Sequence, residues 1–242
     1  MNEFDKSNWA KPEFSRGYRD NADVFIVERR LMLSILQSFY LHFIKNGSRR
    51  TVLDLGCGDG IVTSVIAGVD SRISATLVDG SGDMLKKARE RLSGLNKTTY
   101  IRSSFQEMIR GNTVRGKFDF IASSLAIHHL SMDEKKALFE KVYRLLKRGG
   151  YFLNIDVVLA SSGPVEEWFL SLWKDWINER AWDLGIKENQ FENIIDGYKD
   201  NRDNKPNRLE DQLDALRTTG FADVDCYYKY GIFTIFGGRR AG

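Results

Sequence analysis

The most constraining feature of the sequence is a short apolar run, Thr51–Leu55, followed by glycines at every second position, Gly56, Gly58 and Gly60. Residues 60–68 then have the spacing of a helix. A glycine-rich turn between a buried strand and a helix permits a sharp bend and a close approach of a ligand to the main chain. The helix N-terminus also presents free N–H groups to an anion. The pattern predicts a nucleotide-like ligand, with a purely structural turn as the alternative.

Predicted strands and helices alternate after this turn. Strands are expected at residues 73–78, 99–102, 118–123 and 151–158, and helices at 81–93, 133–146 and 206–219. Two further strands, at 224–230 and 232–236, flank Gly231 as in an antiparallel hairpin. This alternation predicts an α/β fold with a doubly wound, mostly parallel sheet and a C-terminal hairpin on its edge.

Two segments lie outside the alternation. Residues 21–46 carry apolar side chains near helical spacing and predict one continuous helix, so residues 1–48 are interpreted as an N-terminal helical cap segment. Residues 161–205 show no strand signal, and a tryptophan-rich apolar stripe between Val165 and Ile177 predicts a helix there. Residues 49–242 are interpreted as one domain that carries a helical insertion at about 161–205.

The composition sets limits on partners and location. The chain has 242 residues, of which 42% are apolar, and a formal net charge of +3, which gives no argument for nucleic-acid binding. Cys57 and Cys226 lie far apart and form no metal-like cluster, so no metal is expected. No apolar run reaches the ~18 residues of a spanning helix, and the N-terminus lacks the core of a signal peptide. These features predict a cytoplasmic protein without a membrane segment.

Asp79 narrows the class of ligand. It ends the second predicted strand, 19 residues after Gly60, where a carboxylate can accept hydrogen bonds from both ribose hydroxyls. A dinucleotide fingerprint, G-x-G-x-x-G, requires a third glycine at the position where this chain has Ile61. A nucleoside ligand is therefore favoured over a nicotinamide or flavin dinucleotide.

Four stretches together resemble a known family, the class I S-adenosylmethionine-dependent methyltransferases. They are VLDLGCGDG (52–60), LVDGSGDML (77–85), FDFIASSLAIHHL (118–130) and LLKRGGYFLNID (145–156), in the family's order and spacing. The terminal stretch 221–238 is similar to the family's closing hairpin. The resemblance implies a Rossmann-like, seven-stranded sheet with the 161–205 insertion as a helical lid. It also implies S-adenosylmethionine as the methyl donor and S-adenosylhomocysteine as its product.

The resemblance implies cofactor-binding positions on the first two strands. Gly56 and Gly58 would line the turn under the methionine part of the cofactor, and Asp54 would orient its amino group. Asp79 would hold the ribose.

Further implied contacts surround the adenine. Gly80 and Met84 would lie beside it. The family often carries an aspartate after the third strand, where this chain has Ser104 followed by Phe105, so a hydroxyl replaces the carboxylate.

The remaining implied contacts would close over the cofactor. Ser124 and Leu125 follow the fourth strand. In the N-terminal segment, Tyr18 would cover the methyl-donor end, and Arg30 would pair with the cofactor carboxylate, with simple solvation of Arg30 as the alternative.

Methyl transfer from a sulfonium is an in-line displacement, so the enzyme mainly aligns the acceptor and excludes water. A general base is needed only when the acceptor must lose a proton. His129, after the fourth strand, is the candidate base, and packing or capping of the next helix is its alternative role. The aromatic stripe at 168–176 either packs the inserted helix on the core or faces an acceptor.

Three functions remain open from the sequence. The favoured hypothesis is an S-adenosylmethionine-dependent methyltransferase that acts on a small-molecule acceptor. The second is a tRNA-modifying methyltransferase or an enzyme like carboxy-S-adenosylmethionine synthase, to which residues 210–221 bear a faint resemblance, although 186–197 offer no clear match to its lid arginine. The third is a non-catalytic cofactor-binding protein. The chain is expected to be a monomer or a homodimer.

Overall fold

The computed structural model describes residues 4, 7–45, 50–186 and 193–242. Its centre is a seven-stranded sheet in the order β3-β2-β1-β4-β5-β7-β6. Neighbouring strands from β3 to β5 in this order are parallel, whereas β7 runs antiparallel to both β5 and β6. The strands are β1 (Thr51–Leu55), β2 (Ser74–Asp79), β3 (Thr98–Arg102), β4 (Phe118–Ser124), β5 (Leu146–Val157), β6 (Phe221–Tyr230) and β7 (Phe233–Arg240).

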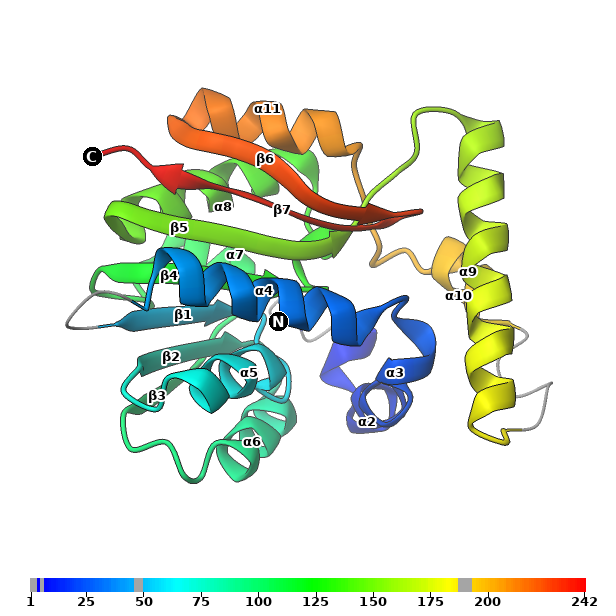
Figure 1. Cartoon of the computed structure of the whole chain (residues 1–242), viewed down its shortest axis with the longest axis horizontal. Coiled ribbons are helices and arrows are strands. Elements are labelled where there is room, and N and C mark those ends of the chain that lie inside the picture. Colours follow the sequence, from blue (N-terminus) through cyan, green and yellow to red (C-terminus); the bar gives the residue numbers. More distant parts are fainter. Residues whose placement is uncertain (1–3, 5–6, 46–49, 187–192) are drawn as a thin grey trace.

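Helices cover both faces of this sheet (Figure 1). One face carries α4 (Arg29–Phe43), α5 (Ile61–Val69) and α6 (Gly82–Arg91), and the other carries α7 (Phe105–Arg110), α8 (Met132–Leu145) and α11 (Leu209–Thr219). The predicted Rossmann-like, doubly wound fold with its antiparallel C-terminal hairpin is confirmed. Among the described residues, no helix is long and apolar enough to cross a membrane.

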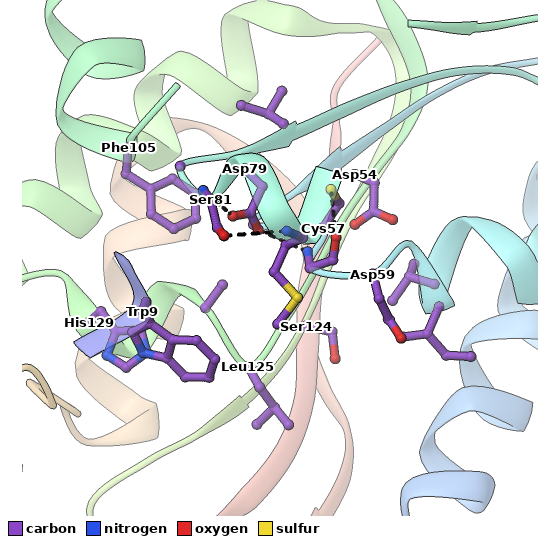
Figure 2. Close-up of a pocket in the computed structure, with 18 of the residues that line it drawn as sticks. Trp9, Asp54, Cys57, Asp59, Asp79, Ser81, Phe105, Ser124, Leu125 and His129 are labelled. Carbon is purple, nitrogen blue, oxygen red and sulfur yellow. Dashed lines mark hydrogen bonds between the residues drawn. The ribbon is translucent and has the colours of Figure 1, made fainter. Parts of the chain in front are cut away.

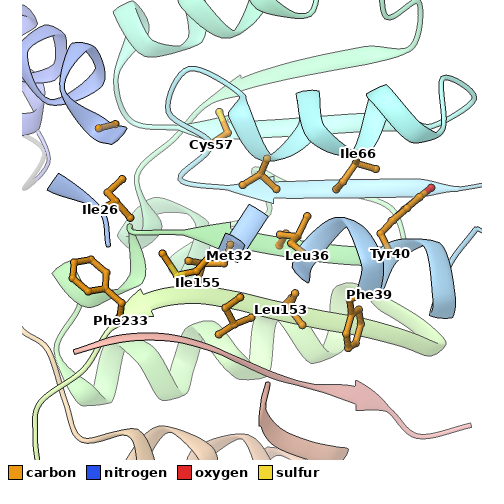
Figure 3. Packing of buried hydrophobic residues seen from close by; sticks show 14 of the residues in the cluster. Ile26, Met32, Leu36, Phe39, Tyr40, Cys57, Ile66, Leu153, Ile155 and Phe233 are labelled. Atoms are coloured by element: carbon orange, nitrogen blue, oxygen red, sulfur yellow. The ribbon is translucent and has the colours of Figure 1, made fainter. Parts of the chain in front are cut away.

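The larger of the two core clusters lies between α4 and the sheet (Figure 3). Met32, Leu36, Phe39 and Tyr40 recur at helical spacing, so they form one buried stripe of α4. Full burial of a side chain such as Leu36 stabilises the fold by about 1.5–3 kcal/mol. The Tyr40 hydroxyl donates a hydrogen bond to Oδ2 of Asp70 at 3.0 Å, which joins α4 to the end of α5. The N-terminal segment therefore shares the core of the sheet.

The expectation of one helix over residues 21–46 is wrong. The chain forms a short helix, α3 (Ala22–Phe25), then breaks, and α4 begins at Arg29. Glu28 has a left-handed φ of 48°. The break places Ile26 and Val27 in the core, where both are buried. Neither a glycine nor a proline lies at this position. The break is set by the burial of Ile26 and Val27 and not by the conformational preference of a turn residue.

The inserted segment forms α9 (Gly163–Asp183) and α10 (Ile194–Asp200), and α9 stands beside the sheet next to α3 (Figure 1). The indole N–H of Trp173 donates to the Phe25 carbonyl at 2.7 Å. The Trp173 ring also meets Phe233 edge-on, with centroids 5.5 Å apart. Trp168 and Trp182 are exposed instead. The aromatic stripe thus joins the insertion to the N-terminal segment and to β7.

Candidate active site

A cavity of about 460 Å³ lies at the carboxyl ends of β1, β2 and β4 (Figure 2). The strand order reverses between β1 and β4, and in open α/β sheets the ligand crevice forms at such a point. The predicted cofactor residues that line the cavity are Asp54, Gly56, Gly58, Asp79, Gly80, Met84, Ser104, Phe105, Ser124 and Leu125. The fold thus gathers ten of the twelve predicted contacts around one space.

The glycines after β1 differ in what surrounds them. Gly56 has a φ of +61°, and a Cβ placed there would lie 2.4 Å from the Cβ of Ala126. Gly58 has a φ of +52°, and a Cβ there would meet nothing within 4 Å. Gly56 therefore permits close packing against the loop after β4, whereas Gly58 leaves the main chain bare on the cavity side.

Asp79 connects the end of β2 to the glycine turn. Its Oδ2 accepts the backbone N–H of Gly58 at 2.9 Å, and its Oδ1 accepts that of Ser81 at 2.8 Å. Burial raises the pKa of Asp79, and these two N–H groups oppose the rise. An ionised carboxylate offers about four acceptor positions, so Asp79 retains capacity for ribose hydroxyls.

Asp54 is fully buried at the end of β1 and holds one unsatisfied oxygen. Oδ2 accepts hydrogen bonds from the Thr63 N–H at 3.2 Å and the Thr63 hydroxyl at 2.7 Å. Oδ1 has no hydrogen-bond partner among the described residues. Burial raises the pKa of Asp54 to about 7. A buried acceptor without a partner is destabilising, so this oxygen is suited to receive a cationic donor from a ligand.

Leu125 follows β4 in a strained conformation. Its φ is +51°, which is unfavourable for a leucine. Its N–H donates to the Ile155 carbonyl at 2.8 Å, and this bond holds the strained turn against β5. Strain held by the surrounding structure is typical of functional sites, and Leu125 forms a wall of the cavity.

His129, in the 3-10 helix η2 (Ile127–His129), also lines the cavity. Its Nδ1 lies 3.1 Å from the Asp203 carbonyl oxygen, which can only accept, so Nδ1 carries a proton. Burial lowers the pKa of His129 well below its usual range, so the ring is neutral near pH 7. Nε2 therefore holds a lone pair, and it has no hydrogen-bond partner among the described residues.

The wall around His129 comes from segments that are distant in sequence. Trp9, in η1 (Asn8–Ala10), meets the His129 ring edge-on with centroids 5.5 Å apart (Figure 2). The Asn8 N–H donates to Oδ2 of Asp203 at 3.0 Å. Trp9, Asp203 and Lys205 all line the cavity, although no pattern in the sequence singles them out. Trp9 lies in a polar stretch without periodicity, and the segment around Asp203 is polar and carries no motif.

Of the two remaining predicted contacts, Arg30 and Tyr18, only Arg30 has a side chain that the structure describes. The side chain of Arg30 is 81% exposed, lies 3.7 Å from Asp23 and does not line the cavity, which agrees with solvation, the alternative role of this residue. Arg29 lines it instead, since the break at Glu28 sets which face of α4 turns inward. The side chain of Tyr18 lies outside the described residues. No described residue of α9 lines this cavity either.

Three other side chains near the site serve the structure. Ser104 caps α7, a helix missed from the sequence, in a capping box with Glu107. The spacing of serine and glutamate three residues later was its signal. His128 does not line the cavity, and its Nδ1 lies 2.6 Å from Oδ1 of Asp156. Cys57 is buried, and its burial raises the pKa of the thiol, so it packs in the turn as a small neutral side chain.

Comparisons with known proteins give similarities to methyltransferases. A family model described as a methyltransferase domain matches residues 52–150. A carboxy-S-adenosyl-L-methionine synthase of Nautilia profundicola is 18% identical over 211 residues, covering 85% of this chain and 81% of the relative. An uncharacterized methyltransferase of Synechocystis sp. is 29% identical over 136 residues, covering 55% of this chain and 59% of the relative. The structure of an O-methyltransferase family 2 protein from Planctomyces limnophilus, in complex with apigenin, matches with a TM-score of 0.65 and 16% identity, over 100% of this chain and 62% of that one.

Residues 52–150 match a methyltransferase domain, and the fold is that of the class I S-adenosylmethionine-dependent methyltransferases. S-adenosylmethionine is the cofactor of this class, and the cavity residues fit it. The free oxygen of Asp54 can accept the ammonium of the methionine part, and Gly58 leaves room for a close approach. Asp79 retains acceptor capacity for the ribose.

Proposed function

We propose that this enzyme transfers a methyl group from S-adenosylmethionine to a small-molecule acceptor that loses a proton to His129. The observation that carries the proposal is the neutral His129 ring, which lines the same cavity as Asp54 and Asp79 and whose buried Nε2 has no hydrogen-bond partner among the described residues. A base with a low pKa requires an acceptor that gives up its proton readily. Either the hydroxyl or amine of the acceptor is itself acidified, or its proton leaves as the new bond forms.

The protein's part in this reaction is binding, alignment and proton removal. S-adenosylmethionine, when bound, supplies a methyl group activated by its positively charged sulfur. Asp79 would hold the nucleoside end, Gly58 would lie under the methionine part, and Asp54 would receive the ammonium. Trp9 and the residues of α3 and α4 shield the acceptor side from water, which favours an in-line approach of acceptor and methyl group. His129 Nε2 accepts the proton that the acceptor releases.

A small acceptor fits this geometry better than a polynucleotide. The cavity of about 460 Å³ falls in the range of small-molecule sites. The structural neighbour from Planctomyces limnophilus is described in complex with apigenin, a small molecule. The carboxy-S-adenosyl-L-methionine synthase relative, at 18% identity, is the reason to keep chemistry on the cofactor itself as a second candidate. Arg19 and Arg29 line the cavity and could pair with the carboxylate that such chemistry requires.

The test supplies purified protein with methyl-labelled S-adenosylmethionine, a panel of small hydroxyl and amine acceptors, and bulk tRNA. Mass analysis of the nucleoside pool reports any modified cofactor. Label in a small acceptor supports the proposal, whereas label in tRNA alone or a carboxylated cofactor would replace it. No transfer despite cofactor binding would leave a binding protein.

The role of His129 is separated from cofactor binding by substitution. His129→Ala should slow transfer by about 10²–10⁴-fold, the usual contribution of a general base. Cofactor affinity should stay the same by calorimetry. His42→Ala is the matched control, because His42 lies on α4 and does not line the cavity. Full activity of His129→Ala would remove the base from the proposal.

Asp79→Ala tests the nucleoside end. It removes charge-assisted hydrogen bonds worth ~1.5–3 kcal/mol, so cofactor affinity should fall about 10–100-fold. Because Asp79 also accepts two backbone N–H groups, the melting temperature must be measured beside affinity. Asp79→Asn keeps the shape and one acceptor oxygen, and it should lose less of both. Unchanged affinity in Asp79→Ala would refute the placement of the ribose.

A further inference from the structure

Lys135, on α8, is fully buried and does not line the cavity. A buried ammonium is destabilising unless acceptors surround it. Its Nζ donates to the Leu130 carbonyl at 2.7 Å, the Lys205 carbonyl at 2.6 Å and Oδ1 of Asn207 at 2.6 Å. The three N–H donors of Lys135 are thus matched by three acceptors, two of which belong to the loop at residues 203–207.

This loop, which we name the 203–207 loop, is held at several points. The Lys205 N–H donates to the His128 carbonyl at 2.8 Å, and the Leu159 N–H donates to the Asn207 carbonyl at 3.1 Å. Pro206 restricts the backbone of Lys205 to extended conformations. Lys135 is buried, and it binds both Lys205 and Asn207 of this loop. Its removal would release the loop on the side that faces α8.

Within the part of the chain that the structure describes, the 203–207 loop also supplies the carbonyl that pairs with the His129 ring. The Asp203 carbonyl accepts from His129 Nδ1 at 3.1 Å, while Oδ2 of Asp203 accepts the Asn8 N–H. The tautomer of a histidine is set by the hydrogen-bond partner of each ring nitrogen. An acceptor fixed at Nδ1 keeps the proton there and the lone pair on Nε2.

We infer that Lys135 is a positioning residue for methyl transfer, because it holds the 203–207 loop so that the Asp203 carbonyl keeps the His129 proton on Nδ1. The inference rests on the proposed function, in which His129 is the base. Lys135 acts through the loop, because it does not itself line the cavity. A purely structural role would stabilise the fold without affecting the tautomer of His129, and this difference is measurable.

The experiment records the tautomer of each imidazole by long-range ¹H–¹⁵N NMR near neutral pH. The chain has three histidines, so spectra of His42→Gln and His129→Gln assign the His129 signals by subtraction. The native protein should show His129 with its proton on Nδ1. Lys135→Met should show a mixture of tautomers, and its methyl transfer should fall about 10–100-fold, as for other outer positioning contacts, with cofactor affinity unchanged. Lys136→Met is the matched control, because Lys136 is exposed on the same helix and should change neither measurement.

Each outcome bears on the inference. A His129 proton on Nε2 in the native protein would overturn it without any variant. A folded Lys135→Met protein that keeps the native tautomer would also overturn it. If Lys135→Met does not fold, Asn207→Ala removes one acceptor and leaves the lysine, and it should give a smaller shift of the tautomer; no shift would overturn the inference. Full activity of His129→Ala would refute the base and with it a role of Lys135 in methyl transfer. Slow transfer in His129→Ala with the native tautomer in Lys135→Met would overturn the inference alone, so the two failures are distinguishable.

Discussion

The two sides of the cavity are built in different ways. On the side proposed for the cofactor (the cofactor side), the Gly58 N–H and the Asp79 carboxylate that it meets are 21 positions apart in the sequence. On the side proposed for the acceptor (the acceptor side), the Asn8 N–H reaches an Asp203 oxygen across 195 positions, and His129 meets the Asp203 carbonyl across 74. The cofactor side is set by neighbouring strand–turn units, whereas the acceptor side is assembled by packing of distant segments.

This difference decides what a substitution should affect. The cofactor side consists largely of backbone groups in constrained conformations, such as Gly56 and Leu125. The acceptor side consists of side chains, such as Trp9 and His129, held by loop contacts. Changes on the first side should disturb the fold and the cofactor together, and changes on the second should disturb the reaction while leaving the fold intact.

The largest effect is expected from Gly56→Ala. A Cβ at Gly56 would overlap Ala126 in a left-handed conformation. Backbone strain of about 1–2 kcal/mol and overpacking of about 1–3 kcal/mol should together lower the free energy of unfolding by ~2–5 kcal/mol. Denaturant unfolding of the cofactor-free protein measures this loss.

Gly58→Ala is the matched control for that loss. It has a similar positive φ, but its Cβ would meet open space. Its stability should fall only by the strain, about 1–2 kcal/mol. The added methyl group would project toward the cofactor, so cofactor affinity should fall by about tenfold or 1.4 kcal/mol. Equal losses of stability at the two glycines would show that the contact with Ala126 does not matter.

The sequence could predict that the residues of the cofactor side lie together, because their signals are local. The glycine spacing, Asp79 and the strand pattern each lie within one strand–turn–helix unit, and the fold places all of them at one cavity. The acceptor side left no such signal. Trp9 and Lys205 reach the cavity only through the topology of the whole chain, and the break before Arg29 results from the burial of Ile26 rather than from a turn residue. Local patterns in one sequence do not reveal contacts that depend on the packing of distant segments.

The next largest effect is the pH dependence that Asp54 gives to stability and to cofactor affinity. Burial raises its pKa to about 7 in the folded, cofactor-free protein, above its ordinary value of 3.8. The folded state therefore binds more protons than the unfolded state between about pH 4 and 7, and this group's contribution to stability falls as pH rises through that window. An ammonium at Oδ1 favours the ionised form, so cofactor binding should release a proton below pH 7. Affinity should then rise by at most about tenfold per pH unit up to pH 7.

Calorimetry in buffers of different ionisation enthalpy measures the proton release. Asp54→Asn is the control, because it keeps the shape of the side chain and removes the titration. It should bind the cofactor more weakly and with a flat pH profile over the same window. A pH-dependent affinity that survives in Asp54→Asn would assign the proton to another group on the cofactor side.

The smallest effect separates two neighbouring arginines and tests where the acceptor side begins. Arg29 lines the cavity and pairs with Oδ1 of Asp23 at 2.6 Å, whereas the side chain of Arg30 is 81% exposed and lies 3.7 Å from the other Asp23 oxygen. A partly exposed ion pair is worth ~0.2–1 kcal/mol, so Arg29→Ala should weaken cofactor binding or acceptor turnover by about two- to fivefold. Arg30→Ala should change neither, since solvent already screens its charge. Steady-state kinetics with calorimetry of both variants measures the difference.

Asp23→Ala separates two explanations of a loss in Arg29→Ala. If Arg29 acts only by anchoring the segment to Asp23, Asp23→Ala should reproduce the loss. If Arg29 faces a ligand carboxylate, Asp23→Ala should leave binding unchanged or tighter. An equal loss in Arg30→Ala would mean that the break at Glu28 does not decide which arginine faces the site.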